Sequence, residues 1–209
     1  MKKAFLVVDI QNDFLPGGSL AVHEGNHVIP LINQLVKKDF DIIVASKDWH
    51  PSDHSSFAEN HGKKPGEKIQ LKGLEQILWP VHCVQDTIGA EFASDLDISQ
   101  FEKIFFKGTD RDIDSYSAFF DNGFLKSTCL GEYLKSKKVT DIYIAGLTTD
   151  YCVKFSVLDA IQLGFKVHVI LDACRAVNLK LGDSEKAVDE MEEAGAEITA
   201  TAKILKLSG

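Results

Sequence analysis

Six short runs of apolar residues recur along the 209-residue chain, and most of them are continuous instead of alternating with polar positions. They lie at Ala4–Val8, Asp41–Ser46, Lys103–Phe106, Asp141–Ala145, Lys166–Leu171 and Glu197–Ala202. A strand of a parallel sheet is covered on both faces, so its sequence has no polar side. The runs therefore predict six strands of a parallel sheet.

Stretches in which apolar residues follow a helical spacing separate these runs. The stripes comprise Val28, Ile32, Leu35 and Val36, then Leu130, Tyr133 and Leu134, then Val153, Ser156, Val157, Ala160 and Ile161. A further helix is expected to begin near Asp183 as its N-cap and to end near Gly195. This alternation predicts an α/β fold with three layers (α/β/α) around a six-stranded parallel sheet, and the length fits a single domain over residues 1–209.

One long segment interrupts the alternation. Residues 47 to about 95 contain both tryptophans, three of the five prolines and most of the histidines. A long irregular segment inside a compact domain usually has a function, and this composition argues against disorder. We expect this insertion to carry binding residues.

The formal net charge of −8 argues against two classes of partner. Nucleic acids and anionic membranes attract basic surfaces, and no lysine or arginine stripe stands out. The four cysteines, at positions 83, 129, 152 and 174, form no CxxC pair and are typical of reduced thiols. We therefore expect a cytoplasmic protein without nucleic-acid or membrane partners, and a homo-oligomer is one option for its assembly.

Reactive side chains follow four of the predicted strands. Asp9 follows the first, Lys47-Asp48-Trp49-His50 ends the second, Lys107 follows the third, and Cys152 lies shortly after the fourth. The carboxyl ends of parallel strands form one edge of the sheet, where ligands bind in α/β folds. One such residue alone would mean little. The combination predicts a site that joins a carboxylate, an ammonium, a thiol and metal-type ligands.

Cys152 falls in the first turn of a predicted helix and is the best candidate for a nucleophile. Unpaired amides at a helix start, together with the Lys107 ammonium, favour the thiolate form of a cysteine, and Asp9 could accept the thiol proton. The alternative is that Cys152 is a small buried residue without chemistry. Cys174, which follows the fifth strand, is the reserve candidate, and the other two cysteines are expected to be structural.

The same edge also holds metal-type ligands. Asp48 and His50 stand at i and i+2 in an extended segment, so both side chains can face one side. His82 lies in the stiff aromatic context Trp79-Pro80-Val81-His82-Cys83. Two imidazoles and a carboxylate suit Zn²⁺, and also Fe²⁺ or Mn²⁺. His54 could be a further ligand or a solvated loop residue, and His61 is expected to be exposed.

These residues stand in motifs that resemble a known family, the nicotinamidases of the isochorismatase-like cysteine hydrolase superfamily. The resemblance spans most of the chain. It rests on Val8-Asp9-Ile10-Gln11-Asn12-Asp13-Phe14, Lys47-Asp48-Trp49-His50-Pro51, Trp79-Pro80-Val81-His82-Cys83, Phe106-Lys107-Gly108 and Gly146-Leu147-Thr148-Thr149-Asp150-Tyr151-Cys152-Val153. The second and third motifs point to the nicotinamidase branch. The resemblance implies the isochorismatase-like, Rossmann-like hydrolase fold.

The resemblance also implies roles for individual residues. Those that match the catalytic triad are Asp9, Lys107 and Cys152. The amides that match an oxyanion hole belong to Thr148 and Cys152, beside a cis peptide bond between Leu147 and Thr148. The residues that match metal ligands are Asp48, His50 and His82. The aromatic residues that match the lining of the ring pocket are Phe14, Trp79 and Tyr116.

The activity implied by the resemblance is the hydrolysis of nicotinamide to nicotinate and ammonia through a thioester on Cys152, as a step of NAD salvage. One divalent metal, expected to be Zn²⁺ with Fe²⁺ or Mn²⁺ as alternatives, would anchor the pyridine nitrogen. Three other interpretations stay open. They are another cysteine amidohydrolase of the superfamily, catalysis by a metal-bound hydroxide with an idle thiol, and a metal- or pyridine-binding module without turnover.

Overall fold

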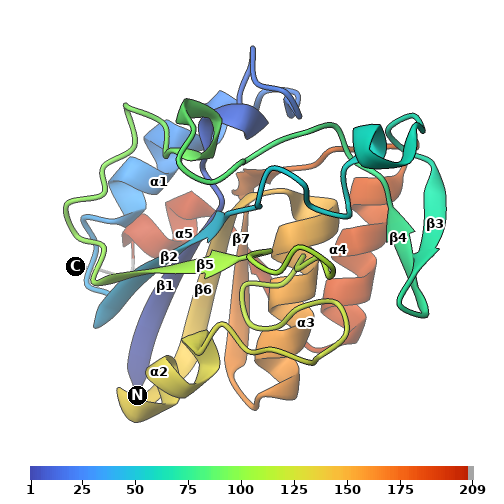
Figure 1. Cartoon of the computed structure of the whole chain (residues 1–209). Helices are drawn as coiled ribbons and strands as arrows, with labels where there is room; N and C mark the ends of the chain where they lie inside the picture. Colours follow the sequence, from blue (N-terminus) through green and yellow to red (C-terminus); the bar gives the residue numbers. More distant parts are fainter. Residues whose placement is uncertain (207–209) are drawn as a thin grey trace.

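The computed structural model describes residues 1–206 and contains a six-stranded sheet in the order β5-β2-β1-β6-β7-β8 (Figure 1). The strands are β1 (Lys2–Val8), β2 (Ile42–Asp48), β5 (Lys103–Lys107), β6 (Val139–Leu147), β7 (Lys166–Arg175) and β8 (Glu197–Thr199). Every neighbouring pair in this sheet runs parallel. The predicted parallel sheet is therefore confirmed.

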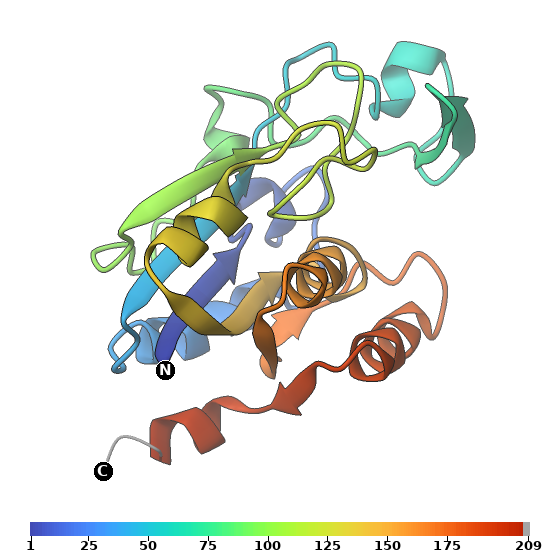
Figure 2. The same ribbon diagram turned by 90° about the horizontal axis from the view of Figure 1, so that it is seen from below.

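Helices cover both faces of the sheet, as Figure 1 and Figure 2 show. One face carries α1 (Ile29–Leu35) and α5 (Thr201–Lys206), and the other carries α2 (Leu130–Ser136), α3 (Lys154–Gln162) and α4 (Asp183–Glu193). The chain steps one way across the sheet from β1 to β2 and the opposite way from β6 through β7 to β8. Right-handed crossovers then place the connecting helices on opposite faces. The predicted three-layer α/β/α fold is confirmed.

The central strand β1 explains why the apolar runs are continuous. Residues Ala4–Val8 are each 0 % exposed, because β2 and β6 flank the strand and helices cover both of its faces. Burial of a side chain the size of Leu6 or Phe5 stabilises the fold by about 1.5–3 kcal/mol. A polar residue on either side of this strand would lose its hydration without gaining a partner.

Helix α4 begins one residue away from the expected position. Asp183 is its first residue and Gly182, with a φ of 91°, is the N-cap. The end is as predicted: Gly195 has a φ of 106°, and the Ala196 N–H donates to the Met191 carbonyl at 2.9 Å. This bond and the left-handed residue before it are the usual closure of a helix C-terminus.

The last strand is shorter than predicted, because β8 ends at Thr199 and not at Ala202. The N–H and the hydroxyl of Thr201 both donate to Asp172 Oδ1, at 2.8 and 3.1 Å. These two bonds turn the chain out of the sheet and into α5, a helix that the apolar pattern did not predict.

The insertion between β2 and β5 contains a hairpin that the sequence analysis missed. Strands β3 (Lys68–Leu71) and β4 (Leu74–Ile77) pair antiparallel around Lys72 and Gly73, whose φ values are 49° and 83°. Two consecutive left-handed residues form the tight turn that joins hairpin strands. The hairpin lies next to α4 (Figure 1). Within residues 1–206, no helix combines the length and apolar character needed to cross a bilayer.

The Gly146→Ala substitution should destabilise the fold. Gly146 has a φ of 135° and lies between β1 and β7, where an added Cβ would stand 2.1 Å from the Val8 carbonyl oxygen. We expect a loss of at least about 2 kcal/mol in the free energy of unfolding, measured by urea denaturation.

The matched control is Gly164→Ala, because Gly164 also has a positive φ (89°) but nothing within 4 Å of an added Cβ. It should cost about 1 kcal/mol, from backbone strain alone. Equal losses in the two variants would contradict the close approach of β1 and β6.

Candidate active site

The candidate site lies where β5, β2, β1 and β6 end, because these four strands are consecutive neighbours in the sheet. Asp48 and Lys107 are the last residues of β2 and β5 and are paired in register. Asp9 follows β1 directly, and Cys152 lies in the π-helical turn Thr149–Val153 between β6 and α3. The topology thus brings the four residues to one edge of the sheet.

The ammonium of Lys107 is the centre of this group. Its Nζ lies 3.0 Å from Asp9 Oδ2, 2.9 Å from Asp48 Oδ1 and 3.4 Å from Cys152 Sγ, and it donates to the Ser115 carbonyl at 3.0 Å. The residue is 2 % exposed. Burial alone would lower the pKa of Lys107, but the charges of Asp48 and Asp9 outweigh burial and raise this pKa well above its usual value. The side chain is therefore a permanent buried cation.

The carboxyl of Asp9 is fully buried and is a stronger base than an ordinary aspartate. Burial raises the pKa of Asp9, the Lys107 ammonium opposes this rise, and the negative charge of Asp48 adds to it. The Ser46 hydroxyl donates to Asp9 Oδ1 at 2.6 Å and favours the ionised form. A carboxylate with a raised pKa suits a group that must accept a proton near neutral pH.

The thiol of Cys152 does not have the acidity expected from the sequence. It lies in a π-helical turn and not in the first turn of an α-helix, and it is 6 % exposed. Burial raises the pKa of Cys152 well above its usual value; Lys107 lowers it, and Asp9 and Asp48 raise it further. The factors that favour a thiolate in the sequence are outweighed by burial, which position along the chain does not reveal. The structure instead has a neutral thiol beside a base.

The Leu147–Thr148 peptide bond before this turn is cis, as the resemblance implied. Thr148 is 2 % exposed and lines the same cavity as Cys152. Its carbonyl accepts the N–H groups of Tyr151 and Val153, at 3.2 and 2.9 Å. These bonds fix the backbone on both sides of the thiol.

Asp48, His50 and His82 converge beside Lys107. The Oδ2 atom of Asp48 lies 3.1 Å from His50 Nε2 and 3.4 Å from His82 Nε2. The other ring nitrogens face backbone carbonyls, His50 Nδ1 at 2.9 Å from Gly108 and His82 Nδ1 at 2.7 Å from Pro80. A carbonyl can only accept, so each Nδ1 donates, and both Nε2 atoms face the carboxylate. This second set of bonds is what orients histidines that bind metals.

Charge and space at this point fit a divalent cation. Burial alone would raise the pKa of Asp48, but the charges of His50 and Lys107 outweigh burial and hold that pKa well below its usual range. One ligand atom from each of Asp48, His50 and His82 lies within 4.8 Å of the others. Two imidazoles and one carboxylate are the donors that zinc-type metals prefer. The absence of a side chain at Gly108 makes space for the His50 ring, because a Cβ there would stand 2.4 Å from His50 Cε1.

His54 is buried at 0 % exposure, so it is not a solvated loop residue. Its Nδ1 lies 2.7 Å from Ser56 Oγ, and its buried Nε2 has no hydrogen-bond partner. Burial and the neighbouring His50 lower the pKa of His54 to about 4, so the ring is neutral. Together with His50 and Asp114, it forms a second group of ligand atoms within 4.8 Å.

A cavity of about 310 Å³, counted with its open mouth, lies against these groups. Its lining comprises Phe14, Leu20, Asp48, Trp79, His82, Asp114, Tyr116, Thr148, Tyr151, Cys152 and Val177. This size and this apolar lining with few polar groups are typical of small-molecule sites. All three ring-pocket residues singled out in the sequence line it. The thiol of Cys152 and two of the metal-type ligands, Asp48 and His82, therefore line one common space.

Tyr151 and Asp114 of this cavity, and Gln76 behind its lining, were not predicted from the sequence. Tyr151 packs edge-on against Trp79, with ring centroids 4.9 Å apart. Its position next to Cys152 in the sequence could have indicated that it lies in the site. Gln76, on β4, donates to Asp114 Oδ2 at 3.0 Å and to the Tyr116 hydroxyl at 3.3 Å. No sequence signal pointed to Gln76 or Asp114, because the hairpin that carries Gln76 was not predicted.

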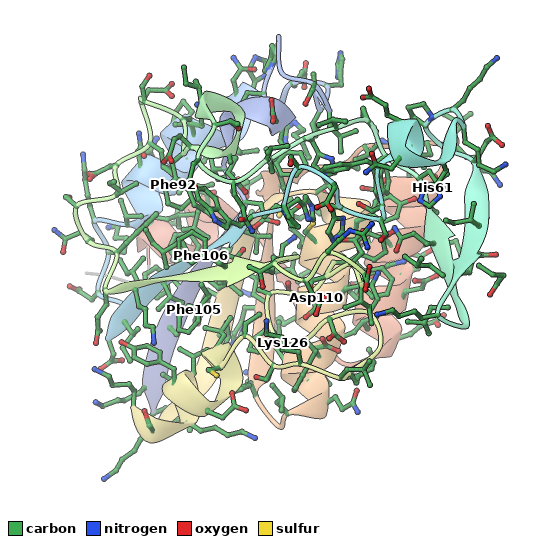
Figure 3. The ribbon with its side chains drawn as sticks, viewed as in Figure 1. His61, Phe92, Phe105, Phe106, Asp110 and Lys126 are labelled. Atoms are coloured by element: carbon green, nitrogen blue, oxygen red, sulfur yellow. The ribbon has the colours of Figure 1, made fainter. Side chains whose placement is uncertain are left out.

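The other cysteines and His61 lie outside the group. Cys174 is buried, its thiol donates to the Ile170 carbonyl at 3.4 Å, and burial raises its pKa to about 12. Cys129 is exposed and Cys83 is buried with a pKa raised well above its usual value by burial. His61 lies on the insertion near the hairpin, away from the sheet, and is exposed as predicted (Figure 3).

Comparison with known proteins agrees with this fold. The isochorismatase domain family matches residues 3–203, and the chain belongs to this family. The nicotinamidase of Escherichia coli (strain K12) is 47 % identical over 197 residues, which cover 93 % of this chain and 92 % of that protein. The resemblance drawn from the motifs is therefore confirmed.

Two solved structures extend the comparison. A nicotinamidase pyrazinamidase of Acinetobacter baumanii is 44 % identical, has a TM-score of 0.93 and is matched over 97 % of both chains. A pyrazinamidase of Pyrococcus horikoshii in complex with zinc is 37 % identical and has a TM-score of 0.78, with 96 % of this chain and 99 % of that chain matched.

The His50→Ala substitution should abolish stable metal binding. It removes one of two imidazoles and leaves Asp48 to face a single nitrogen. We expect zinc affinity to fall by at least about 100-fold, measured by competition with a chromogenic chelator. His61→Ala is the control, because His61 is exposed and bonded only to the Ser55 carbonyl. Unchanged zinc affinity in His50→Ala would contradict the site.

Proposed function

We propose that the chain acts as a nicotinamidase, which hydrolyses nicotinamide to nicotinate and ammonia as a step of NAD salvage. One observation carries the proposal: a single buried ammonium contacts a base, a thiol and a carboxylate that also faces two histidines. The high identity to an Escherichia coli nicotinamidase supports this substrate. The zinc in the Pyrococcus pyrazinamidase supports zinc as the metal here.

The substrate is held between the aromatic walls and the metal-type ligands. Phe14, Trp79 and Tyr116 line the cavity, and in this proposal they pack on the pyridine ring and keep bulk water out. Asp48, His50 and His82 would hold a divalent metal, zinc in this proposal, and the metal would supply a Lewis acid that can anchor a pyridine nitrogen. The carboxamide then faces the sulfur of Cys152.

The first half of the reaction forms a thioester. Asp9 accepts the thiol proton of Cys152, and the resulting thiolate attacks the carboxamide carbon. The backbone amides of Thr148 and Cys152 donate to the oxygen that becomes negative, a contribution of about 3 kcal/mol per donor. Asp9 returns its proton to the leaving nitrogen, so ammonia departs and the acyl group stays on Cys152.

The second half releases the acid. Asp9, ionised again, takes a proton from a water molecule that attacks the thioester carbon, and the thiolate leaves and is reprotonated as nicotinate departs. Lys107 keeps its charge throughout and offsets the negative charge, which moves from Asp9 to the sulfur and back. The raised pKa of Asp9 favours the two steps in which it accepts a proton, from the thiol and from water.

The proposal also covers the setting of the enzyme. Residues 1–209 form a single domain, and the insertion at about 47–95 binds the metal. Nicotinamide is the small-molecule partner. The cytoplasm is its proposed location. This agrees with four cysteines that are all free.

The direct test is ammonia release from nicotinamide, with and without prior removal of the metal by a chelator. Cys152→Ala should lower this release by at least about 1000-fold while zinc content stays intact, because no nucleophile remains. Cys174→Ala is the matched control and should keep turnover within about threefold, because its thiol is bonded inside the sheet. Persistent turnover in Cys152→Ala would favour attack by a metal-bound hydroxide.

The Ser46→Ala substitution should shift the pH dependence of kcat/KM. The Ser46 hydroxyl stabilises ionised Asp9, so its loss raises the pKa of Asp9 further. The reaction needs the ionised form of Asp9. The acidic limb of the kcat/KM profile should therefore move to higher pH, by about 1 unit. Ser136→Ala, which removes an exposed hydroxyl bonded to the Tyr133 carbonyl, should leave the profile unchanged. A shift toward lower pH would rule out Asp9 as the base.

A further inference from the structure

Gln11 stands two residues after Asp9 in the first motif, and the proposed reaction gives it no task. It is 0 % exposed, and its side-chain amide is fully bonded. Its Oε1 accepts the Asp48 N–H at 2.8 Å, and its Nε2 donates to the Asp48 carbonyl at 2.7 Å and to the Ala90 carbonyl at 2.9 Å. One side chain thus holds both peptide groups of a metal-type ligand.

The reason for this arrangement lies in the end of β1. The register of β1 with β2 stops at Val8 and Ser46, and Asp9 then turns away with a φ of 50°. The peptide groups of Asp48 that face β1 therefore have no strand to pair with, although they are buried. The amide of Gln11 has the same donor and acceptor as a peptide group and takes the place of the missing strand.

The carboxylate of Asp48 needs such a support. It contacts Lys107 through Oδ1 at 2.9 Å and the imidazoles of His50 and His82 through Oδ2 at 3.1 and 3.4 Å. If the Asp48 backbone rotated slightly, the carboxylate could not keep its contacts with Lys107 and with the two imidazoles at the same time. Groups that hold a ligand in place commonly affect metal affinity 10- to 100-fold.

Asp13 provides a second support in the same segment. Its Oδ2 accepts the N–H of Cys83, the residue after His82, at 2.7 Å. The carboxylate lies against Gly89, where a Cβ would stand 2.1 Å from Oδ2. The segment that carries Asp9 therefore holds the backbone beside two of the three metal-type ligands.

We infer that Gln11 is a positioning residue for the metal site: it fixes Asp48 in the orientation that serves the metal and Lys107 together. This inference rests on the metal-binding part of the proposed function. It does not depend on nicotinamide being the substrate, because metal binding is measured without it.

The test uses Gln11→Met and Gln11→Glu in the full chain. Met has a similar length but bonds neither peptide group, and Glu keeps the acceptor but sets an oxygen against the carbonyls of Asp48 and Ala90. Zinc dissociation constants, measured by chelator competition, should rise about 10- to 100-fold in both. The visible spectrum of the cobalt-loaded protein should also change, because the carboxylate meets the metal at a different angle.

Asn12→Ala is the matched control, because the neighbouring side-chain amide bonds only the Ile88 carbonyl and touches no metal-type ligand. It should leave both the zinc affinity and the cobalt spectrum unchanged. Zinc affinity within threefold of the wild type in both Gln11 variants would overturn the inference, and so would an equal loss in Asn12→Ala.

A second measurement covers the case in which the variants do not fold. In the metal-free wild-type protein, the Asp48 amide should exchange its hydrogen slowly, because Gln11 Oε1 is its acceptor before any metal binds. Fast exchange of this amide would overturn the inference. If the zinc results hold while wild-type enzyme releases no ammonia, then the proposed substrate fails and the role of Gln11 stands.

Discussion

The structure of the site depends on one buried cation, the Lys107 ammonium. It lies between two carboxylates, Asp9 and Asp48, in a place that water does not reach. Without this charge, two buried negative groups would repel each other, and one of them would have to take up a proton. The ammonium thereby allows the base and the metal-type ligands to share one cavity. The order of the strands in the sheet is what places Lys107, Asp48 and Asp9 side by side.

Burial then sets the chemistry of each group around this cation. Desolvation raises the pKa of both Asp9 and Cys152, so the resting pair is a basic carboxylate and a neutral thiol. Charge moves between these two groups only during the reaction, and Lys107 contacts both of them. A site of this kind needs no exposed thiolate, which would react with other electrophiles before a substrate arrives.

The sequence predicted the elements whose pattern is local. Each of the six sheet strands was predicted, because complete burial of a strand such as Ala4–Val8 leaves a continuous apolar run. The residues at the strand ends were predicted too, because one edge of a parallel sheet collects them. The hairpin was missed, since each of its strands is only 4 residues long and its clearest signal is Gly73 in the turn. The end of β8 was missed because it depends on bonds between Thr201 and Asp172, which are far apart in the chain.

The acidity of Cys152 could not be predicted for a similar reason. Its neighbours along the chain indicate a helix start, whereas its neighbours in space remove water and add two carboxylates. The supporting roles of Ser46 and Gln11 also come from contacts between different strands. Sequence motifs therefore identified which residues meet, and only the fold determined how they affect each other.

The β3–β4 hairpin contacts the cavity from one side, through hydrogen bonds to two of the lining residues. The floor belongs to the central strands, whereas Gln76 ties the hairpin to Asp114 and Tyr116 by two hydrogen bonds. Most hairpin side chains are only partly covered or exposed, so little apolar burial holds this element down. The hairpin therefore supports Asp114 and Tyr116, two residues of the cavity lining, from outside the main sheet, whereas the reactive groups stand at the ends of the central strands.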